Sequence, residues 1–293
     1  MIIVKLFGGV GNQMFQYATA KRVAQLNNSQ LKLDISHYDN HVLPNGLPYR
    51  SYDLTMFNIP EAIATKEEID KFKDIPTSIL SRGIRKIRNY INPHTVIYEP
   101  HFHFYPELLE KKGNIYLEGY WQSEKYFKYI SKTIREQFQI FPDLNDEEQE
   151  LLNKIKHTNA VCLNVRRQEF ASNPHVDQFI GLEYIERGIQ RMVEKINNPF
   201  FFIFSDELSW CKTNLKIQHP HLFVEERFYG EKFQKCLFFM IACKHYIIPN
   251  STFAWWAAWL NDRPDKVVIA PQKWLKDQSK NTKDILPESW LKL

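Results

Sequence analysis

Cysteine is scarce in this sequence and is never arranged as a metal or redox motif. Only four cysteines occur among 293 residues, and no two of them form a Cys-x-x-Cys pair. Their spacing excludes the common zinc-binding and thioredoxin-like patterns. We therefore expect reduced, structural thiols, as in a cytosolic protein. The four residues are Cys162, Cys211, Cys236 and Cys243.

Long hydrophobic runs are also absent. The longest ones, residues 236–243 and 252–260, are far shorter than the ~20 apolar residues that span a bilayer. Met1 leads directly into an apolar segment without a basic region or a cleavage site, so we expect no secretory signal. These absences predict a soluble, cytoplasmic protein. Peripheral contact with the inner membrane is an alternative, because residues 80–91 predict a basic amphipathic helix.

Metal-binding and phosphate-binding motifs are incomplete. His101 and His103 share one face of an extended segment but lack a third ligand, so we interpret them as ordinary polar residues. The glycine loop at residues 8–11 lacks the Lys-Ser/Thr of a Walker A motif, and Met14 stands where the dinucleotide fingerprint has its third glycine. The loop suits a phosphate, a sugar or merely tight packing. Asp34 could act as the ribose-binding acid of that fingerprint, which keeps an NAD(P)-dependent oxidoreductase as an alternative.

Length and charge bound the organisation of the chain. The net charge of +4 and the isoelectric point near 8.7 suit a small acidic ligand and do not demand a nucleic acid. A chain of 293 residues is long enough for two domains, each with its own core. Proline and acidic residues in the segment 138–146 indicate the boundary. We predict an N-terminal domain of residues 1–150 and a C-terminal domain of residues 151–293.

Three predicted strands each end in polar residues. Residues 160–170 begin as an apolar strand and then turn abruptly to two arginines, which a dry sheet could not continue without unpaired charge. Residues 200–207 and 245–252 repeat the pattern, and amphipathic helical segments separate the three. This alternation predicts an α/β fold with a doubly wound parallel sheet, which binds ligands at the carboxyl ends of its strands. The side chains expected to meet there are Arg166, Arg167, Ser205, Asp206, Asn250, Ser251 and Thr252.

Two further segments are suited to binding. Residues 252–260 are apolar on all sides, which predicts a buried helix with Ser or Asn as its N-cap and an N-terminus that suits a phosphate. The cluster Tyr120-Trp121-Gln122 combines rings that stack on sugars with an amide that binds hydroxyl groups. Aromatic residues at a domain junction would explain the same cluster.

Several motifs together resemble a known family. They are residues 8–18, 119–123, 164–170, 204–207 and 247–260. In order and spacing they resemble the bacterial α-1,2-fucosyltransferases of glycosyltransferase family 11. The resemblance implies a GT-B-like fold of two Rossmann-like domains facing across a cleft, with the nucleotide sugar held by the C-terminal one. The implied activity is inverting transfer of L-fucose from GDP-β-L-fucose to the 2-hydroxyl of a terminal galactose, in O-antigen or lipopolysaccharide synthesis.

The resemblance also implies roles for single residues. Arg166 matches an arginine on the β-phosphate, and Arg167 matches a neighbour that orders the site. Asp206 matches a carboxylate that recognises guanine or ribose, and Asn12 would face the fucose. The other residues assigned to GDP-fucose are Asn164, Ser205, Asn250, Ser251 and Thr252.

The chain departs from the family pattern at two places, and both bear on the chemistry. Asn164 replaces a histidine, and residues 168–169 read Gln-Glu where Gly-Asp is usual. Inverting transfer needs a base for the acceptor hydroxyl and positive charge for the departing diphosphate. Glu169 is the first candidate for the base and Asp206 the second. No Asp-x-Asp motif is present, so we expect Arg166 and the buried helix's N-terminus to replace a metal, with no cofactor.

The expected partners are GDP-fucose and a galactose-terminated oligosaccharide, which can be lipid-linked. A nucleic acid is not expected. Because the acidic position at residue 169 departs from the family, a non-catalytic carbohydrate-binding protein is a further alternative. Release of GDP during incubation with donor and acceptor separates these alternatives.

Overall fold

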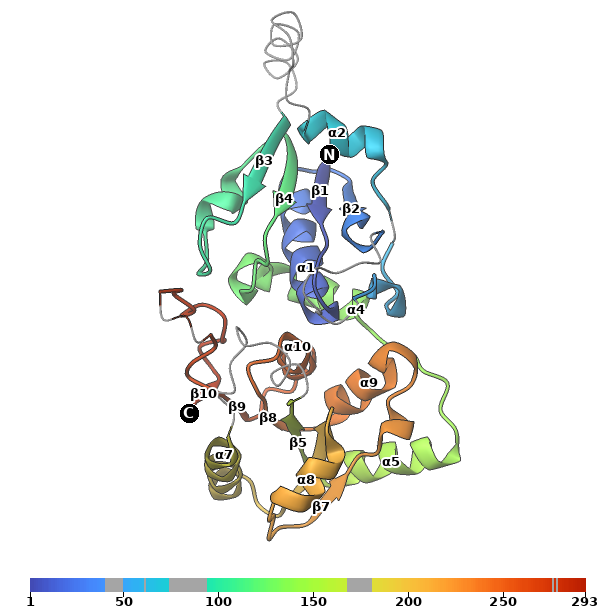
Figure 1. The fold of residues 1–293 in the computed structure, drawn as a ribbon, viewed down its shortest axis with the longest axis vertical. Helices are drawn as coiled ribbons and strands as arrows, with labels where there is room; N and C mark the ends of the chain where they lie inside the picture. The colour runs from blue at the N-terminus through green and yellow to red at the C-terminus, as the bar shows by residue number, and fades with distance from the viewer. Residues whose placement is uncertain (40–49, 61, 74–93, 168–180, 276, 278) are drawn as a thin grey trace, which may run out of the picture. The chain divides into compact units, whose positions relative to one another are not determined.

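The computed structural model describes residues 1–293 except 40–49, 61, 74–93, 168–180, 276 and 278. The chain forms two compact units (Figure 1). Unit 1 consists of Met1–Gln137 and Lys283–Ile285, and unit 2 of Phe138–Thr282 and Leu286–Leu293. The predicted basic helix at residues 80–91 lies outside the described residues. Within the described part of the chain, no helix is both long enough and apolar enough to cross a membrane.

The boundary between the units lies at Phe138 rather than at residue 150. Position 150 falls inside helix α5 (Asp146–His157), which packs against β5 (Asn159–Val165) and α9 (Gln234–Ala242) of unit 2. A capping box between Asn145 and Glu148 starts this helix, and the Glu148 carboxylate pairs with Lys235 of unit 2 at 2.8 Å. The composition change at residues 138–146 therefore marks the first residues of unit 2.

Unit 1 is built on a parallel sheet in the order β2-β1-β4-β3. Its strands are β1 (Ile2–Lys5), β2 (Leu31–Asp34), β3 (His94–Tyr98) and β4 (Asn114–Glu118). Ile2 pairs with Leu31 on one side and with Ile115 on the other, so β1 is a central strand. The glycine loop at residues 8–11 follows β1 and leads into a helix that begins directly after Gly9.

Helices lie against both faces of this sheet. α1 (Val10–Leu26) packs against β1 and β2, and α2 (Lys66–Lys73) packs against β3 and β4. Ile3 and Tyr116 share a hydrophobic cluster with Phe72 of α2. Since side chains alternate along a strand, the neighbours of Ile3 point the other way, toward α1. The remaining helical elements are Ser36–Tyr38, Leu54–Met56, Pro106–Glu110, Glu124–Tyr126, Lys128–Ile130 and α4 (Ser131–Gln137).

Unit 2 contains a second, larger parallel sheet in the order β10-β9-β8-β5-β6-β7. Its apolar strands β5 and β6 are both interior strands with a partner on each side, as the predicted α/β fold requires. The final segment of the chain, which the sequence pattern left unassigned, adds the edge strand β10 beside β9. The strands after β5 are β6 (Pro199–Ser205), β7 (His221–Phe223), β8 (His245–Ile247), β9 (Val268–Ala270) and β10 (Leu291–Lys292).

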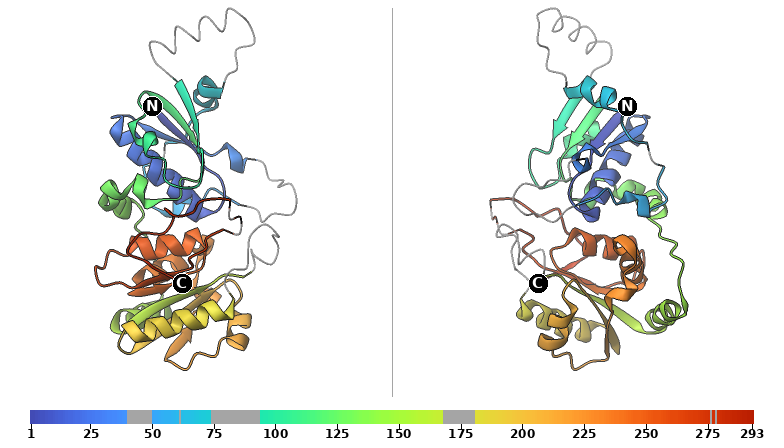
Figure 2. Two further views of the ribbon diagram at one scale, coloured as in Figure 1. Left: turned by 90° about the vertical axis from the view of Figure 1, so that its left-hand side faces the viewer. Right: turned by 45° about the vertical axis from the view of Figure 1, so that its right-hand side comes forward.

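This sheet is doubly wound, with helices on both faces (Figure 2). Val161, Leu163 and Val165 of β5 join a core cluster with residues of α7 (Leu182–Lys195) and α8 (Leu208–Asn214). Cys162 points to the opposite face, where it contacts Cys243 at the end of α9. The remaining helical elements are Glu226–Phe228, Glu231–Phe233 and α10 (Thr252–Leu260).

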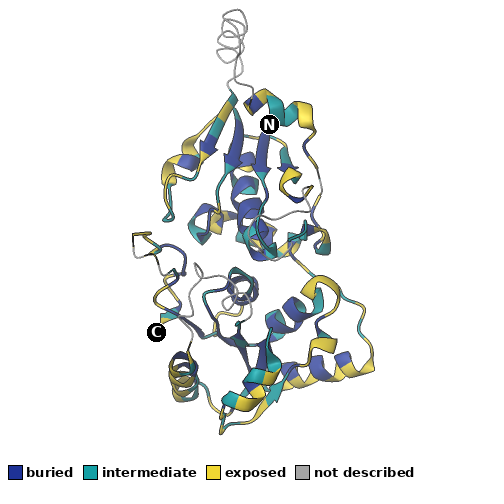
Figure 3. Cartoon of the chain, viewed as in Figure 1, coloured by how far each residue is buried: buried dark blue, intermediate teal, exposed yellow. Residues whose placement is uncertain are grey.

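The burial of α10 confirms the prediction of a helix that is apolar all round. Every residue from Ala254 to Leu260 is buried (Figure 3). Trp255 packs its ring against those of Trp256, Trp259 and Trp290, with centroids 5.0 to 6.0 Å apart. All four cysteines are free and buried, as expected of structural thiols.

Candidate functional site

The sheet of unit 2 brings three of the predicted strand ends side by side. β5 lies between β6 and β8, with Val165 paired to Ser205 and Leu163 paired to Ile247. Because all three strands are parallel, the residues that follow them emerge at one edge of the sheet. We call this group the strand-end site. It comprises Asn164, Arg166, Arg167, Ser205, Asp206, Asn250, Ser251 and Thr252.

Asp206 links the two arginines of the strand-end site. Its Oδ1 accepts a hydrogen bond from the backbone N–H of Arg167 at 2.8 Å, and its Oδ2 lies 3.9 Å from Nε of Arg166. The side chains of Arg166 and Asp206 are 25% and 21% exposed, so both are held at the edge without being sealed from a ligand. The guanidinium of Arg166 also acts on Cys236 in the first turn of α9, where burial raises the thiol pKa and the arginine opposes the rise.

Arg167 is held by two residues that the sequence did not single out. Its Nε donates to Oε2 of Glu207 at 3.0 Å, and its Cζ lies 3.8 Å from the centroid of the Trp210 ring. A carboxylate and an aromatic face together orient a guanidinium. Glu207 adjoins Asp206 in the sequence, but nothing local marks its partner or the ring. This geometry suits a residue that orders the site.

Ser205 is occupied in shaping the chain at the end of β6. Its Oγ accepts a hydrogen bond from the N–H of Glu207 at 3.0 Å, and the residue is 3% exposed. Its backbone N–H donates to the hydroxyl of Tyr229 at 3.0 Å. Tyr229 therefore clamps the strand end from which Asp206 projects, a role that the sequence pattern did not indicate.

The other members of the strand-end site are tied to neighbouring carbonyl groups. Nδ2 of Asn164 donates to the carbonyl of Phe204, and Nδ2 of Asn250 to the carbonyl of Trp274, each at 3.2 Å. Ser251 is the N-cap of α10 as predicted, although its side chain makes no capping hydrogen bond. Thr252 opens the helix, so the N–H groups of its first turn face the end from which an anion would approach.

Asn12 lies in unit 1, in the first turn of α1. Its Oδ1 accepts a hydrogen bond from Nε2 of Gln122 at 2.9 Å. Its Nδ2 lies over Gly8, which has φ +78°, and a Cβ at Gly8 would stand only 2.6 Å from that nitrogen. The glycine thus makes room for the amide. Of the predicted aromatic cluster, Trp121 is fully buried and cannot stack on a sugar, because its ring fills the core beside Tyr126.

Asp34 is unable to serve as a ribose-binding acid. Its side chain is fully buried, and its carboxylate accepts hydrogen bonds from the hydroxyl of Tyr116 and, at 3.0 Å, from the N–H of Ser36. Nζ of Lys73 lies 3.5 Å away. Burial acts to raise the pKa of Asp34, but these partners outweigh it and hold the pKa below its ordinary value. The carboxylate is committed to the fold, which removes one support of the oxidoreductase alternative.

Two predicted features concern metals and the catalytic base. The rings of His101 and His103 stack with centroids 3.5 Å apart. Across the described ranges, no group of three or more His, Cys, Asp or Glu side chains is placed to hold a metal ion. Glu169, with its neighbour Gln168, lies outside the described residues, so its role as the base stays a prediction.

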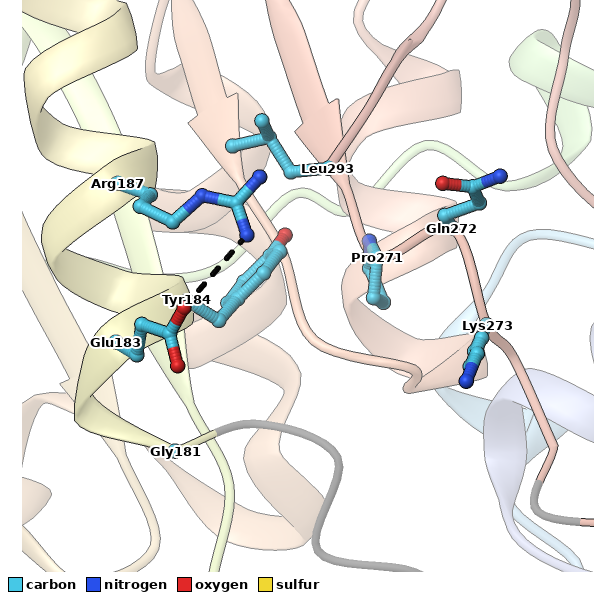
Figure 4. A pocket seen from close by; sticks show the side chains of 8 residues that line it. All are labelled: Gly181, Glu183, Tyr184, Arg187, Pro271, Gln272, Lys273 and Leu293. Carbon is cyan, nitrogen blue, oxygen red and sulfur yellow. Dashed lines mark ion pairs between the residues drawn. The ribbon is translucent and has the colours of Figure 1, made fainter.

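A cavity of about 270 Å³ adjoins the strand-end site within unit 2 (Figure 4). Tyr184 lines it and donates its hydroxyl to the carbonyl of Ile248 at 2.7 Å, just before Asn250. Glu183 and Arg187 of α7 form an ion pair of 3.9 Å at its wall. Among the described residues, no member of the strand-end site lines it. The lining residues are Gly181, Glu183, Tyr184, Arg187, Pro271, Gln272, Lys273 and Leu293.

Fold and site together define the class of protein. Two α/β units with Rossmann-like parallel sheets, one of them carrying paired arginines and a helix N-terminus at its strand ends, are typical of a GT-B-like protein that handles a phosphorylated ligand. The model of Glycosyl transferase family 11 matches residues 97–293, and the chain belongs to this family. It is therefore a glycosyltransferase of family 11, as its motifs indicated.

Relatives extend the comparison over the whole chain. An α-1,2-colitosyltransferase of Escherichia coli is 31% identical and aligns over 100% of this chain and 99% of its own length. The O-antigen biosynthesis glycosyltransferase WbnK of Escherichia coli is 29% identical over 98% of this chain and 99% of its own. The structure of Arabidopsis thaliana FUT1 in complex with GDP superimposes with a TM-score of 0.52 at 11% identity, covering 99% of this chain and 75% of that one. This last likeness shows the fold.

Proposed function

We propose that this glycosyltransferase moves L-fucose from GDP-β-L-fucose to the 2-hydroxyl of a terminal galactose, with inversion to an α-1,2 linkage. The observation that carries the proposal is the strand-end site, where Arg166 and Arg167 are tied to Asp206 beside the N-terminus of α10. Cations and helix N–H groups at a sheet edge suit a nucleoside diphosphate. The motif resemblance supports fucose as the sugar and galactose as the acceptor.

The strand-end site supplies the charge that the leaving group needs. Arg166 and the first turn of α10 would stabilise the negative charge that develops on the diphosphate as the bond to the sugar breaks. Arg167 would keep Arg166 and Asp206 in order through its own contacts with Glu207 and Trp210. Glu169 would accept the proton of the galactose hydroxyl, and Asn12 of unit 1 would contact the fucose.

Because protein cations meet the leaving group, we propose that the reaction needs no metal. Full activity should persist in excess EDTA, and added Mg²⁺ or Mn²⁺ should change the rate little. Initial rates with and without chelator measure this. A rate that collapses in EDTA and returns with one divalent ion would contradict the proposal.

Colitose is an alternative donor sugar to fucose, because a relative of 31% identity carries the name colitosyltransferase. Colitose is L-fucose without its 3-hydroxyl group, so the two donors test whether the site binds that hydroxyl. A site built to hydrogen-bond a hydroxyl discriminates against the analogue that lacks it by a large factor, on the order of 10⁴.

The deciding experiment compares GDP-fucose and GDP-colitose with one galactose-terminated oligosaccharide. We expect kcat/KM to favour GDP-fucose and the product to carry an α-1,2-linked fucose, identified by NMR. A preference for GDP-colitose would replace fucose in the proposal. Binding of the oligosaccharide without transfer from either donor would instead favour the non-catalytic carbohydrate-binding alternative.

A further inference from the structure

Glu99 follows β3 directly, and its carboxylate binds the loop that follows β4. Oε2 accepts a hydrogen bond from the N–H of Tyr120 at 2.8 Å, and Oε1 accepts one from the N–H of Trp121 at 2.9 Å. The N–H of Glu99 donates to the carbonyl of Glu118 at 2.9 Å, which extends the pairing of the two strands to this point. One carboxylate thus holds two consecutive backbone N–H groups of the neighbouring loop.

The conformation of this loop depends on such support. Trp121 has φ +55°, in the left-handed region that a bulky residue adopts only when its surroundings impose it. Its ring is fully buried, and Gly119 leaves no space for a side chain, since a Cβ there would lie 2.4 Å from Cβ of Glu99 and 2.9 Å from the Trp121 ring. The loop, the tryptophan and the carboxylate are therefore packed as one piece.

This loop presents one group suited to a sugar and orients a second. The ring of Tyr120 is 37% exposed and lies edge-to-face against Phe7, with centroids 4.8 Å apart. The amide of Gln122 donates to Asn12 at 2.9 Å, which orients the Asn12 side chain. A partly exposed ring beside an oriented amide is a carbohydrate-binding combination.

The charged form of the Glu99 carboxylate is subject to two opposing effects. Burial raises the pKa of Glu99, while the N–H groups of Tyr120 and Trp121 oppose the rise. None of the ion pairs found among the described residues includes this carboxylate. An apolar residue could fill the space, but only a carboxylate offers two acceptor oxygens to two parallel N–H donors.

We propose that Glu99 is a positioning residue for the acceptor sugar, which holds the Tyr120 ring where it contacts that sugar. The proposal rests on the proposed transferase function. Glu99 itself touches no substrate. Its loss should therefore weaken acceptor binding and leave the nucleotide at the strand-end site unaffected.

The test is Glu99→Gln, which keeps the shape but offers one acceptor oxygen and turns an NH₂ group toward the second N–H. We expect the KM and the dissociation constant for a galactose-terminated oligosaccharide to rise about tenfold or more, since an unsatisfied buried donor destabilises the loop. Glu99→Asp, with its charge kept on a shorter arm, should show a smaller rise. The dissociation constant for GDP should stay unchanged in both.

The matched control is Glu118→Gln, which removes a carboxylate from the end of the adjacent strand. The Glu118 carboxylate pairs with Lys5 at 2.6 Å, and among the described residues no hydrogen bond joins it to the loop, so acceptor affinity should be preserved. If Glu99 acts through Tyr120, Glu99→Gln should add little to the acceptor KM of Tyr120→Ala. Circular dichroism shows whether each variant folds, and Glu99→Asp decides if the Gln variant does not.

An acceptor affinity equal to wild type in a folded Glu99→Gln protein would overturn the proposal, and so would full additivity with Tyr120→Ala. Affinity for GDP that falls in step with acceptor affinity would reduce Glu99 to a general structural role. A wild-type protein that binds the oligosaccharide but transfers no sugar refutes only the proposed function, because the binding constants still test Glu99. A wild-type protein that does not bind the oligosaccharide overturns both.

Discussion

Arg166 and Arg167 are adjacent in the sequence but have different surroundings. Arg167 is held by Glu207 and Trp210, whereas Arg166 has Asp206 at a longer distance of 3.9 Å. We therefore expect Arg166→Lys to fold normally but to lose turnover by about a hundredfold, or about 3 kcal/mol, because a point charge cannot replace a bidentate contact with a diphosphate. Steady-state kinetics measure the loss.

The matched control for that change is Arg191→Lys on α7, whose side chain is exposed and pairs with Glu194. Its turnover should equal that of the wild type. Near-normal activity of Arg166→Lys would mean that the arginine is structural and that the diphosphate binds elsewhere.

Asp34 gives a residue-scale prediction for stability. Asp34→Asn should destabilise unit 1 by about 2–3 kcal/mol at pH 7, because it removes a charged acceptor from Tyr116 and Ser36. The folded pKa lies below the ordinary value of 3.8, so this stabilisation is complete above that value and is lost as pH falls through the folded pKa. Urea unfolding at pH 7 and at acid pH measures both effects.

The control is Asp143→Asn, which removes an exposed carboxylate and should leave the free energy of unfolding unchanged. If the difference between wild type and Asp34→Asn is the same at pH 7 and well below pH 4, the carboxylate charge is not what stabilises the fold.

At the scale of single elements, the turn before α9 contains residues with strained backbone conformations. Gly230 has φ +70° and ψ 178°, a region reserved for glycine, and the next residues include Lys232 and Phe233 in the left-handed region. A Cβ at Gly230 would also lie 2.9 Å from Cγ of Lys235. Gly230→Ala should therefore destabilise the protein by about 1–3 kcal/mol in thermal or urea unfolding.

Gly181→Ala provides the comparison, because Gly181 has φ −79° and a Cβ there meets no atom of the described residues within 4 Å. Alanine is less favourable than glycine at an N-cap, so we expect a loss of up to about 1 kcal/mol, smaller than the loss at Gly230. Equal losses in the two alanine variants would show that the turn at Gly230 is not strained.

At the scale of the whole molecule, the division into two units predicts where the nucleotide acts. Saturating GDP should slow amide hydrogen exchange most in peptides from residues 159–167 and 199–207, which carry the strand-end site in unit 2. At a ligand concentration a hundredfold above its dissociation constant, binding stabilises the folded state by about 2.7 kcal/mol. Mass spectrometry of exchanged peptides locates that protection.

The same measurement separates the competing nucleotide sites. Protection confined to residues 8–34 would place the nucleotide on the glycine loop of unit 1 and revive the oxidoreductase-type arrangement. Arg166→Lys should reduce the protection of unit 2 at a fixed GDP concentration, whereas Arg191→Lys should leave it intact.

The sequence by itself determined the features that depend on local pattern. Alternating apolar residues that stop at Arg166, Asp206 and Asn250 predicted the parallel strands and their shared edge. The spacing of apolar residues and the onset of charged or polar ones can both be recognised within a few residues of sequence. The uniformly apolar segment at residues 252–260 likewise predicted a buried helix, and it is buried. These elements and the membership of most predicted residues in one site followed from the chain alone.

Only the tertiary structure decided which of those residues are already hydrogen-bonded or buried within the fold. Asp34 looked like a ligand-binding acid, yet its carboxylate accepts a hydrogen bond from the hydroxyl of Tyr116 on another strand. Trp121 looked like a sugar platform, yet its ring lies in the core. Glu99 holds the loop after β4 through hydrogen bonds to residues more than twenty positions away in the sequence. Such contacts join segments far apart in the chain, and their energies depend on burial and geometry, which a local pattern does not contain.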